Sequence, residues 1–226
     1  DGFFTGIVTA SSYKLSDGSN VGGVDSDSDG NTVGGTNAGD SITTGTNNTA
    51  FGKDAGTAIT TGVQNTALGK TSLQATTTGG YNSAVGSSAM YSNTTGEYNT
   101  ALGRTALYAN TTADYNTAIG HNALGANTTG QRNTAVGSGA LDTNTTASDN
   151  NAFGESALTA NTTGSDNCAF GRLSLAANTT GVSNSAFGHA TLDANNNNYN
   201  SAFGAEALTN NTVSYTHLTL PTKRIV

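Results

Sequence analysis

The amino-acid sequence predicts an all-β repeat solenoid, or β-roll, built from stacked 17-residue coils. Three observations lead to this prediction. A five-residue phrase recurs every 17 residues along most of the 226-residue chain. A unit of this length is too short for a helical hairpin repeat, which needs about 33 residues or more. Only 34% of residues are hydrophobic and 10% are charged, against about 45–50% and about 25% in ordinary globular domains, so the composition disfavours an enzyme.

The recurring phrase reads Asn, a small polar residue, Ala, a large apolar residue and Gly. The Asn that opens it recurs at a spacing of 17 and finally of 16 residues, at Asn48, Asn65, Asn82, Asn99, Asn116, Asn133, Asn150, Asn167, Asn184 and Asn200. A degenerate first unit starts at Asn31. Side chains of the phrase alternate with the period of a β-strand, so the polar and large apolar residues share one face. Asn, Ala and Gly share the other face.

The rest of each unit carries a second apolar residue, four positions after the Gly, and then a turn sequence such as Asn-Thr-Thr-Gly. Two neighbouring units show the expected ladder of like residues: Asn99, Ala101, Leu102, Gly103 and Leu107 in one, and Asn116, Ala118, Ile119, Gly120 and Leu124 in the next. The segment around the second apolar residue, as at 104–109, allows either a short strand or one helical turn, because Ala and Leu favour helix. Ten coils about 4.8 Å apart would give a rod of roughly 48 Å.

The thin core leads us to expect that copies of the chain associate. We expect each coil to bury two large apolar side chains, which leaves a single-chain rod marginally stable. The flat Ala and Gly face is then expected to pack against identical chains in a parallel homotrimer. The alternative is a lone solenoid that Asn and Thr ladders hold together.

The chain divides into three regions. Residues 1–30 form an N-terminal linker or strand region with an acidic loop, and residues 31–212 form the repeat shaft. Residues 213–226 contain the only proline and lack Gly, Asn and Ala. This tail resembles a translated sequencing adapter, so we expect it to be non-native and the natural chain to continue; a genuine C-terminal strand is the alternative. Because the chain begins at Asp1 without Met or a signal peptide, we expect a fragment or processed form.

Composition also limits the partners. A net charge of −7 disfavours nucleic acid, which needs clustered Lys and Arg. No stretch approaches the roughly 18 apolar residues of a membrane span, so membrane insertion is not expected. One cysteine excludes an internal disulfide framework and a cysteine-based metal cage.

The phrases NTALGRTALYANTT (residues 99–112) and NTAIGHNALGANTTG (residues 116–130) resemble the NTAxGxxALxxNTTG repeats of bacteriophage tail-fibre proteins. Similar repeats occur in surface proteins related to the heads of trimeric autotransporter adhesins. Residues 3–19 resemble a linker phrase of marine phage tail fibres. The resemblance implies a C-terminal intramolecular chaperone domain beyond residue 212. Adhesin heads use shorter coils, so the phage fibre ranks above the bacterial adhesin.

These observations predict a structural and adhesive fibre shaft that presents a host-receptor-binding region, located on a virion. Its expected partners are further copies of the chain and host surface glycans or proteins, which it would hold by multivalent contact. The alternative is a bacterial cell-surface or extracellular filament or adhesin. An ice- or glycan-binding solenoid is a third hypothesis, suggested by the regular Thr rows. It ranks lower because adjacent Thr side chains diverge on an extended strand.

No catalytic residue is predicted, and five other features are candidates for binding, metal or modification sites. Tyr81, Tyr98 and Tyr115 end three successive units and should stack, either as aromatic support or as a sugar-binding ladder. Cys168 replaces the small polar residue of its phrase and is interpreted as a small buried substitute, not a nucleophile. His121 and His189 occupy the sixth position, where other units carry Lys, Arg, Ser, Glu or Ala. This position should therefore be solvated, and its broken basic stripe could meet anionic glycans.

Asp25, Asp27 and Asp29, followed by Gly30, spell the start of a calcium loop. The twelfth loop position is Thr36 and not the bidentate Glu of an EF-hand, so the motif predicts either a calcium site or a solvated acidic linker. No other cofactor is expected. Six Asn-Thr-Thr runs match the N-glycosylation pattern, although turn chemistry explains them more simply: Asn93, Asn110, Asn127, Asn144, Asn161 and Asn178.

Overall fold

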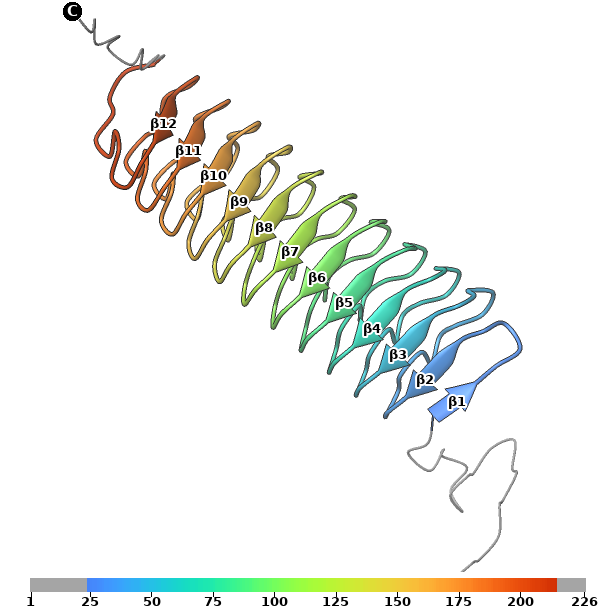
Figure 1. Ribbon diagram of the computed structural model, residues 1–226. Helices are drawn as coiled ribbons and strands as arrows, with labels where there is room; N and C mark the ends of the chain where they lie inside the picture. Colours follow the sequence, from blue (N-terminus) through green and yellow to red (C-terminus); the bar gives the residue numbers. More distant parts are fainter. Residues whose placement is uncertain (1–23, 215–226) are drawn as a thin grey trace, which may run out of the picture.

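A computed structural model describes residues 24–214, which form one β-solenoid with the strands on one side of the stack (Figure 1). The predicted all-β stack of 17-residue coils is confirmed. Twelve three-residue strands form one sheet in chain order: β1 (Val24–Ser26), β2 (Thr32–Gly34), β3 (Thr49–Phe51), β4 (Thr66–Leu68), β5 (Ser83–Val85), β6 (Thr100–Leu102), β7 (Thr117–Ile119), β8 (Thr134–Val136), β9 (Asn151–Phe153), β10 (Cys168–Phe170), β11 (Ser185–Phe187) and β12 (Ser201–Phe203).

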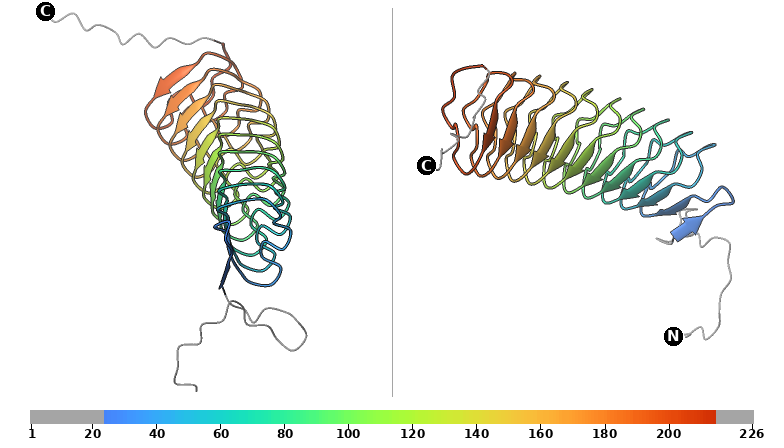
Figure 2. Two further views of the ribbon diagram at one scale, coloured as in Figure 1. Left: turned by 90° about the vertical axis from the view of Figure 1, so that its right-hand side faces the viewer. Right: turned by 45° about the horizontal axis from the view of Figure 1, so that its top comes forward.

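The register of the sheet follows the repeat. From β2 to β12 all pairs are parallel, and like residues pair with like, as Ala101 with Ala118 and Leu102 with Ile119. The rings of Phe153 and Phe170 stack with centroids 4.5 Å apart. β1 differs, because it pairs with β2 in the antiparallel sense and so covers the first edge of the sheet (Figure 2).

The interior is a narrow column of small side chains. Counting each coil from its recurring Asn as position 1, the fully buried apolar residues stand at positions 3, 8 and 9, as with Ala118, Ala123 and Leu124. Ala beneath the strand leaves room for one Leu from the opposite wall. From Leu73 onward the core is therefore a single column of Leu, with Met90 in one coil, between two columns that are mostly Ala; the two earlier coils carry Gly39 and Gly56 in place of the Leu.

The large apolar residue at position 4 points outward, and this corrects two predictions. Its side chain is 47% exposed for Leu102 and 72% exposed for Phe203, so each coil buries one large apolar residue and not two. The predicted packing face of Ala and Gly instead lines the interior. The interior beneath the strand has room only for the Ala methyl group at position 3. Because neighbouring side chains of a strand point to opposite faces, the large residue at position 4 has to face outward.

The segment around position 9 is a series of turns, neither the short strand nor the helical turn that its sequence allows. Thr105 and Leu107 take left-handed conformations with φ of 55° and 51°. Left-handed geometry costs a non-glycine residue about 1–2 kcal/mol, which burial of the Leu side chain offsets. In this geometry the N–H of Leu107 donates to the carbonyl of Ala123 in the next coil at 3.0 Å.

Rows of buried Asn close the coils across their interior, one at position 1 from Asn31 onward and one at position 12 from Asn93 onward, where the three earlier coils carry Ile42, Ile59 and Thr76. In the position-1 row, Asn116 Oδ1 accepts the backbone N–H of Asn133 at 2.9 Å and the Nδ2 of the same residue at 3.2 Å. In the position-12 row, Asn127 Nδ2 donates to Asn110 Oδ1 at 3.1 Å. Within a coil, the two Asn side chains donate to the same backbone carbonyl. Asn116 Nδ2 and Asn127 Nδ2 donate to the Gly130 carbonyl at 2.8 and 2.9 Å.

The coil from Asn184 to Tyr199 is one residue short, and Asn side chains replace the missing backbone groups. Asn196 Oδ1 accepts the N–H groups of Thr179 at 3.0 Å and Thr180 at 2.9 Å. In regular coils the position-13 carbonyl has this role, as Thr60 O accepts from two Thr N–H groups of the preceding coil. The repair is incomplete, because Asn178 Oδ1 is the one buried side-chain polar atom without a hydrogen bond in residues 24–214.

The corner Gly at position 5 is required by close approach between coils. A Cβ on Gly120 would lie 2.6 Å from the carbonyl carbon and oxygen of Gly137, and φ is +135°. We expect Gly120→Ala to lower the free energy of unfolding by about 2–4 kcal/mol, because backbone must move apart. Urea unfolding followed by circular dichroism measures this loss.

Gly204→Ala is the matched control for that prediction. Gly204 has a similar φ of +118°, but nothing lies within 4 Å of its hypothetical Cβ. The control therefore carries the conformational cost without the collision. Equal losses in the two variants would contradict a steric origin.

Candidate functional site

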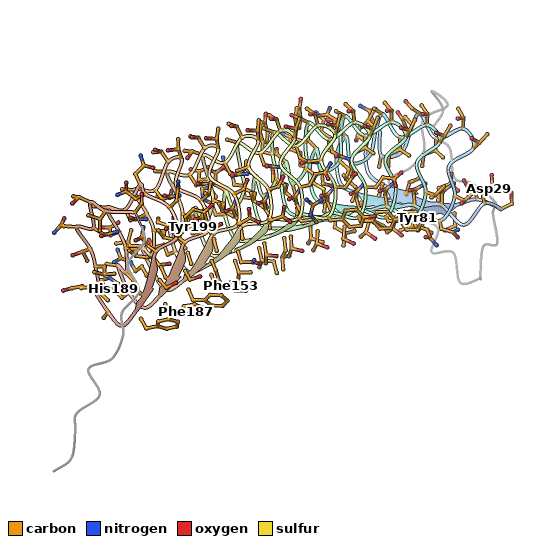
Figure 3. All side chains as sticks on the ribbon, turned by 90° about the horizontal axis from the view of Figure 1, so that it is seen from above. Asp29, Tyr81, Phe153, Phe187, His189 and Tyr199 are labelled. Carbon is orange, nitrogen blue, oxygen red and sulfur yellow. The ribbon has the colours of Figure 1, made fainter. Side chains whose placement is uncertain are left out.

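The outward side chains of the strands form a continuous surface, which we name the sheet face. It consists of positions 2 and 4 of β2 to β12, with Thr, Ser, Asn or Cys in one row and mainly large apolar residues in the other. Neither row contains a charged residue. Phe153, Phe170, Phe187 and Phe203 stack along it at centroid distances of 4.5, 5.1 and 5.0 Å, and Phe153 and Phe187 project from the sheet in Figure 3.

The three tyrosines at position 17 stack with their rings nearly parallel, at 4.8 Å between Tyr81 and Tyr98 and 5.1 Å between Tyr98 and Tyr115. Partial burial, and then the neighbouring Tyr81, raise the pKa of Tyr98. Stacking covers the inner ring faces, so a sugar ring could stack only on the outer faces of Tyr81 and Tyr115. Sugar binding by this ladder stays a prediction.

A second aromatic pair was missed by the sequence reasoning. Tyr91 and Tyr108 stack at 5.2 Å. Both occupy position 10 of successive coils, and this shared position was the signal that could have predicted their contact.

The sixth position is exposed along the rod, as its variable composition predicts. His121 Nε2 lies 3.1 Å from Arg104 Nη1, and His189 Nε2 lies 3.3 Å from Arg172 Nη1. Each contact joins neighbouring coils. Binding of anionic glycans by this stripe stays a prediction.

The acidic loop forms the turn between β1 and β2 at one end of the rod, where Figure 3 labels Asp29. Asp27 Oδ1 accepts the N–H groups of Asp29 at 3.0 Å and Asn31 at 2.8 Å, and Asp27 Oδ2 accepts Asn31 Nδ2 at 2.8 Å. These hydrogen bonds, above all those from Asn31, lower the pKa of Asp27. The carboxylate therefore holds the hairpin turn.

Asp25 lies on β1, and Asp25, Asp27 and Asp29 are all exposed. Within residues 24–214 no three His, Cys, Asp or Glu side chains gather in a way that could hold a metal ion. Calcium binding by this loop stays a prediction.

Cys168 lies on the sheet face in β10 between Asn151 and Ser185. It is half-buried, and not fully buried as predicted, because position 2 points outward. Burial raises the pKa of its thiol, which disfavours the nucleophilic thiolate.

The paired Thr residues of the turns diverge, as their adjacency predicts. At position 13 the hydroxyl turns to the backbone, as Thr94 Oγ1 donates to the Thr111 carbonyl at 3.0 Å and Thr128 Oγ1 to the Thr145 carbonyl at 3.0 Å. At position 14 the side chain is exposed, as in Thr112 and Thr163. A single exposed Thr row remains.

The six Asn residues of the glycosylation pattern are the position-12 row of buried Asn. All are 0% exposed, and the Nδ2 of Asn144 donates to Asn127 Oδ1 at 2.9 Å and to the Ala147 carbonyl at 3.0 Å. A glycan on that nitrogen would break both bonds and require space inside the coil. The folded solenoid therefore has no room for these modifications.

Two of the regions inferred from sequence are only partly described. The N-terminal region 1–30 is described from Val24 onward, and the tail 213–226 only to Ser214. The linker phrase at 3–19 lies outside the described residues. Across residues 24–214 there is no helix with the length and apolar character that a membrane crossing demands.

Comparison of the chain with protein-family models, curated proteins and solved structures gives no match. Any functional assignment therefore rests on the residues and geometry of the chain itself.

We expect the folded protein to carry no N-glycan at Asn144 when a eukaryotic cell secretes it, since the amide is buried. Mass spectrometry of the protease-resistant secreted protein measures occupancy. Thr143→Asn is the control, because Thr143 is exposed and the following residues, Asn144 and Thr145, complete a pattern at an accessible site. A folded protein glycosylated at Asn144 would refute the burial argument.

Proposed function

We propose that residues 31–212 form the shaft of a phage tail fibre, which holds a host-receptor-binding region away from the virion. The observation that carries this proposal is the in-register parallel stack from β2 to β12, in which each coil repeats the contacts of the coil before it. Each added coil extends the rod by about 4.8 Å, so the number of repeats sets the reach. The tail-fibre-like repeat phrases point to the virion as the place where that reach is used.

Hydrogen bonds between coils run along the rod, which suits a load-bearing spacer. Thr100 N–H donates to the Asn116 carbonyl at 2.8 Å, Gly120 N–H to Leu102 at 2.8 Å, and Asn122 N–H to Arg104 at 3.0 Å. A pull on the two ends loads all bonds between a pair of coils together. Side chains that face outward can vary without disturbing these bonds, and the rod can therefore present many weak contacts at regular intervals.

Antibodies against residues 31–212 test the location. We expect them to label tail fibres of virions from the source sample, and peptides of the chain to co-purify with capsid proteins. Recovery of the chain in a bacterial cell-wall fraction, without virion labelling, would overturn the phage assignment in favour of a cell-surface filament.

Coil deletion tests the spacer mechanism. Removal of residues 99–149, three whole coils, should leave a folded rod about 14 Å shorter, because each new neighbour has the same register. Small-angle scattering measures the length. Removal of residues 116–123 is the control, since a partial coil places unlike residues opposite one another and should lower the melting temperature sharply. Equal tolerance of both deletions would contradict the stacking mechanism.

A further inference from the structure

The sheet face is a long uncharged surface without a partner in the described chain, with one polar row and one mainly apolar row. Leu102 is 47% exposed and Phe170 37% exposed on it. Its parallel strands are about 4.8 Å apart and three residues wide, which gives a strip of roughly 50 by 10 Å. The apolar row makes up about half of this strip and runs along it without a charged residue, and a contiguous exposed apolar surface of this length has the character of an interface.

Charged residues border the strip on both sides. The post-strand border, positions 6 and 7, follows the corner Gly, and the pre-strand border, positions 16 and 17, comes before the next strand. Three ion pairs within residues 24–214 join some of these charges: Lys53 with Asp54, Arg132 with Asp149, and Arg172 with Glu155.

The border charges outside those ion pairs differ in sign between the two sides. In the described chain they are Lys70, Arg104 and Glu206 after the strand, a net charge of +1, and Glu97, Asp114 and Asp166 before it, a net charge of −3. Arg104 and Asp114 belong to the same coil. The two sides are therefore complementary in net charge, and one coil carries both signs.

Symmetry decides which arrangement uses this complementarity. If two chains packed face to face in antiparallel directions, each border would meet the same border of its partner, and like charges would oppose. If the chains run parallel around a common axis, the post-strand border of one chain meets the pre-strand border of its neighbour. The net positive border then faces the net negative one, and at β6, which Glu97 precedes and Arg104 follows, opposite charges lie at the same height.

We propose that the sheet face is the seam of a parallel, cyclic assembly of copies of this chain, with complementary borders in contact. A second copy suits the surface because its coils have the same spacing, so rungs can match over the full length. The strip alone provides roughly 500 Å² per chain, below the about 800 Å² per partner of a standard interface, so the borders are needed as well. This inference rests on the proposed shaft function and replaces the Ala and Gly face as the site of self-association.

Removal of the apolar contact is the first test. Light scattering of the full chain should give a multiple of its 22.5 kDa mass. Leu102→Asp combined with Phe170→Asp should give a folded monomer, because both side chains face outward and a charge there would be buried in the seam. Thr112→Asp combined with Thr163→Asp, on the exposed row at position 14, is the control and should remain assembled. A monomeric parent chain at about 100 μM, or an assembled Leu102/Phe170 variant, would overturn the seam.

Charge exchange is the second test, and it leaves the apolar row intact. Lys70→Glu with Arg104→Glu should weaken association about tenfold, and Glu97→Lys with Asp166→Lys should do the same. All four changes in one chain should restore association, because the borders are then complementary with exchanged signs. An antiparallel pair would gain nothing from the combination, so failure of the rescue overturns the parallel arrangement. A monomeric shaft that still labels virions would reject the seam and leave the proposed function standing.

Discussion

The two rows of buried Asn constrain the rest of the structure. Each side-chain amide bonds to the Asn of a neighbouring coil and to the position-15 carbonyl of its own coil, so the amide sets both the coil spacing and the width of the interior. An amide is suited to this role, because it donates and accepts at once and can continue a chain of bonds indefinitely. Buried polar groups are costly unless paired, so a displaced coil would lose bonds on both of its sides. This requirement keeps the coils in register with a core of one Leu column.

The 17-residue period of the sequence predicts the register of the coils. Packing of the interior decides which strand face is buried, and the period alone does not. A fixed spacing of 17 residues places like residues opposite like, which is why the pairing of Phe153 with Phe170 could be predicted. Alternation along the strand separates two faces but does not say which is inside. The choice depends on the width of the interior, and that width is set by the Asn amides and by Leu side chains from the opposite wall.

The turn segment and the sites were less predictable for local reasons. Leu107 is left-handed, a conformation that its own propensity disfavours and that only burial in the finished stack stabilises. Asp27 matches a metal-loop pattern, yet in the structure its oxygens accept hydrogen bonds from Asp29 and Asn31. The same sequence is equally compatible with a metal loop and with this hydrogen-bonded turn. The tyrosine ladder could be predicted because contact between neighbours follows from the period alone. What a ladder binds depends on which ring faces stay open, and the period does not encode this.

The short coil shows how the stack accommodates the loss of one residue. The loss of one residue from a coil removes a backbone N–H and a carbonyl that would otherwise pair with the neighbouring coils. Here the defect stays within a single turn, because the Asn196 side-chain amide has the geometry of a peptide group and accepts the bonds that the lost residue would have taken. The run of Asn residues at 195–198 therefore keeps the strands before and after it in register. A 16-residue coil thus still occupies one step of about 4.8 Å along the stack, so the loss of a residue narrows one coil and leaves the length of the rod unchanged.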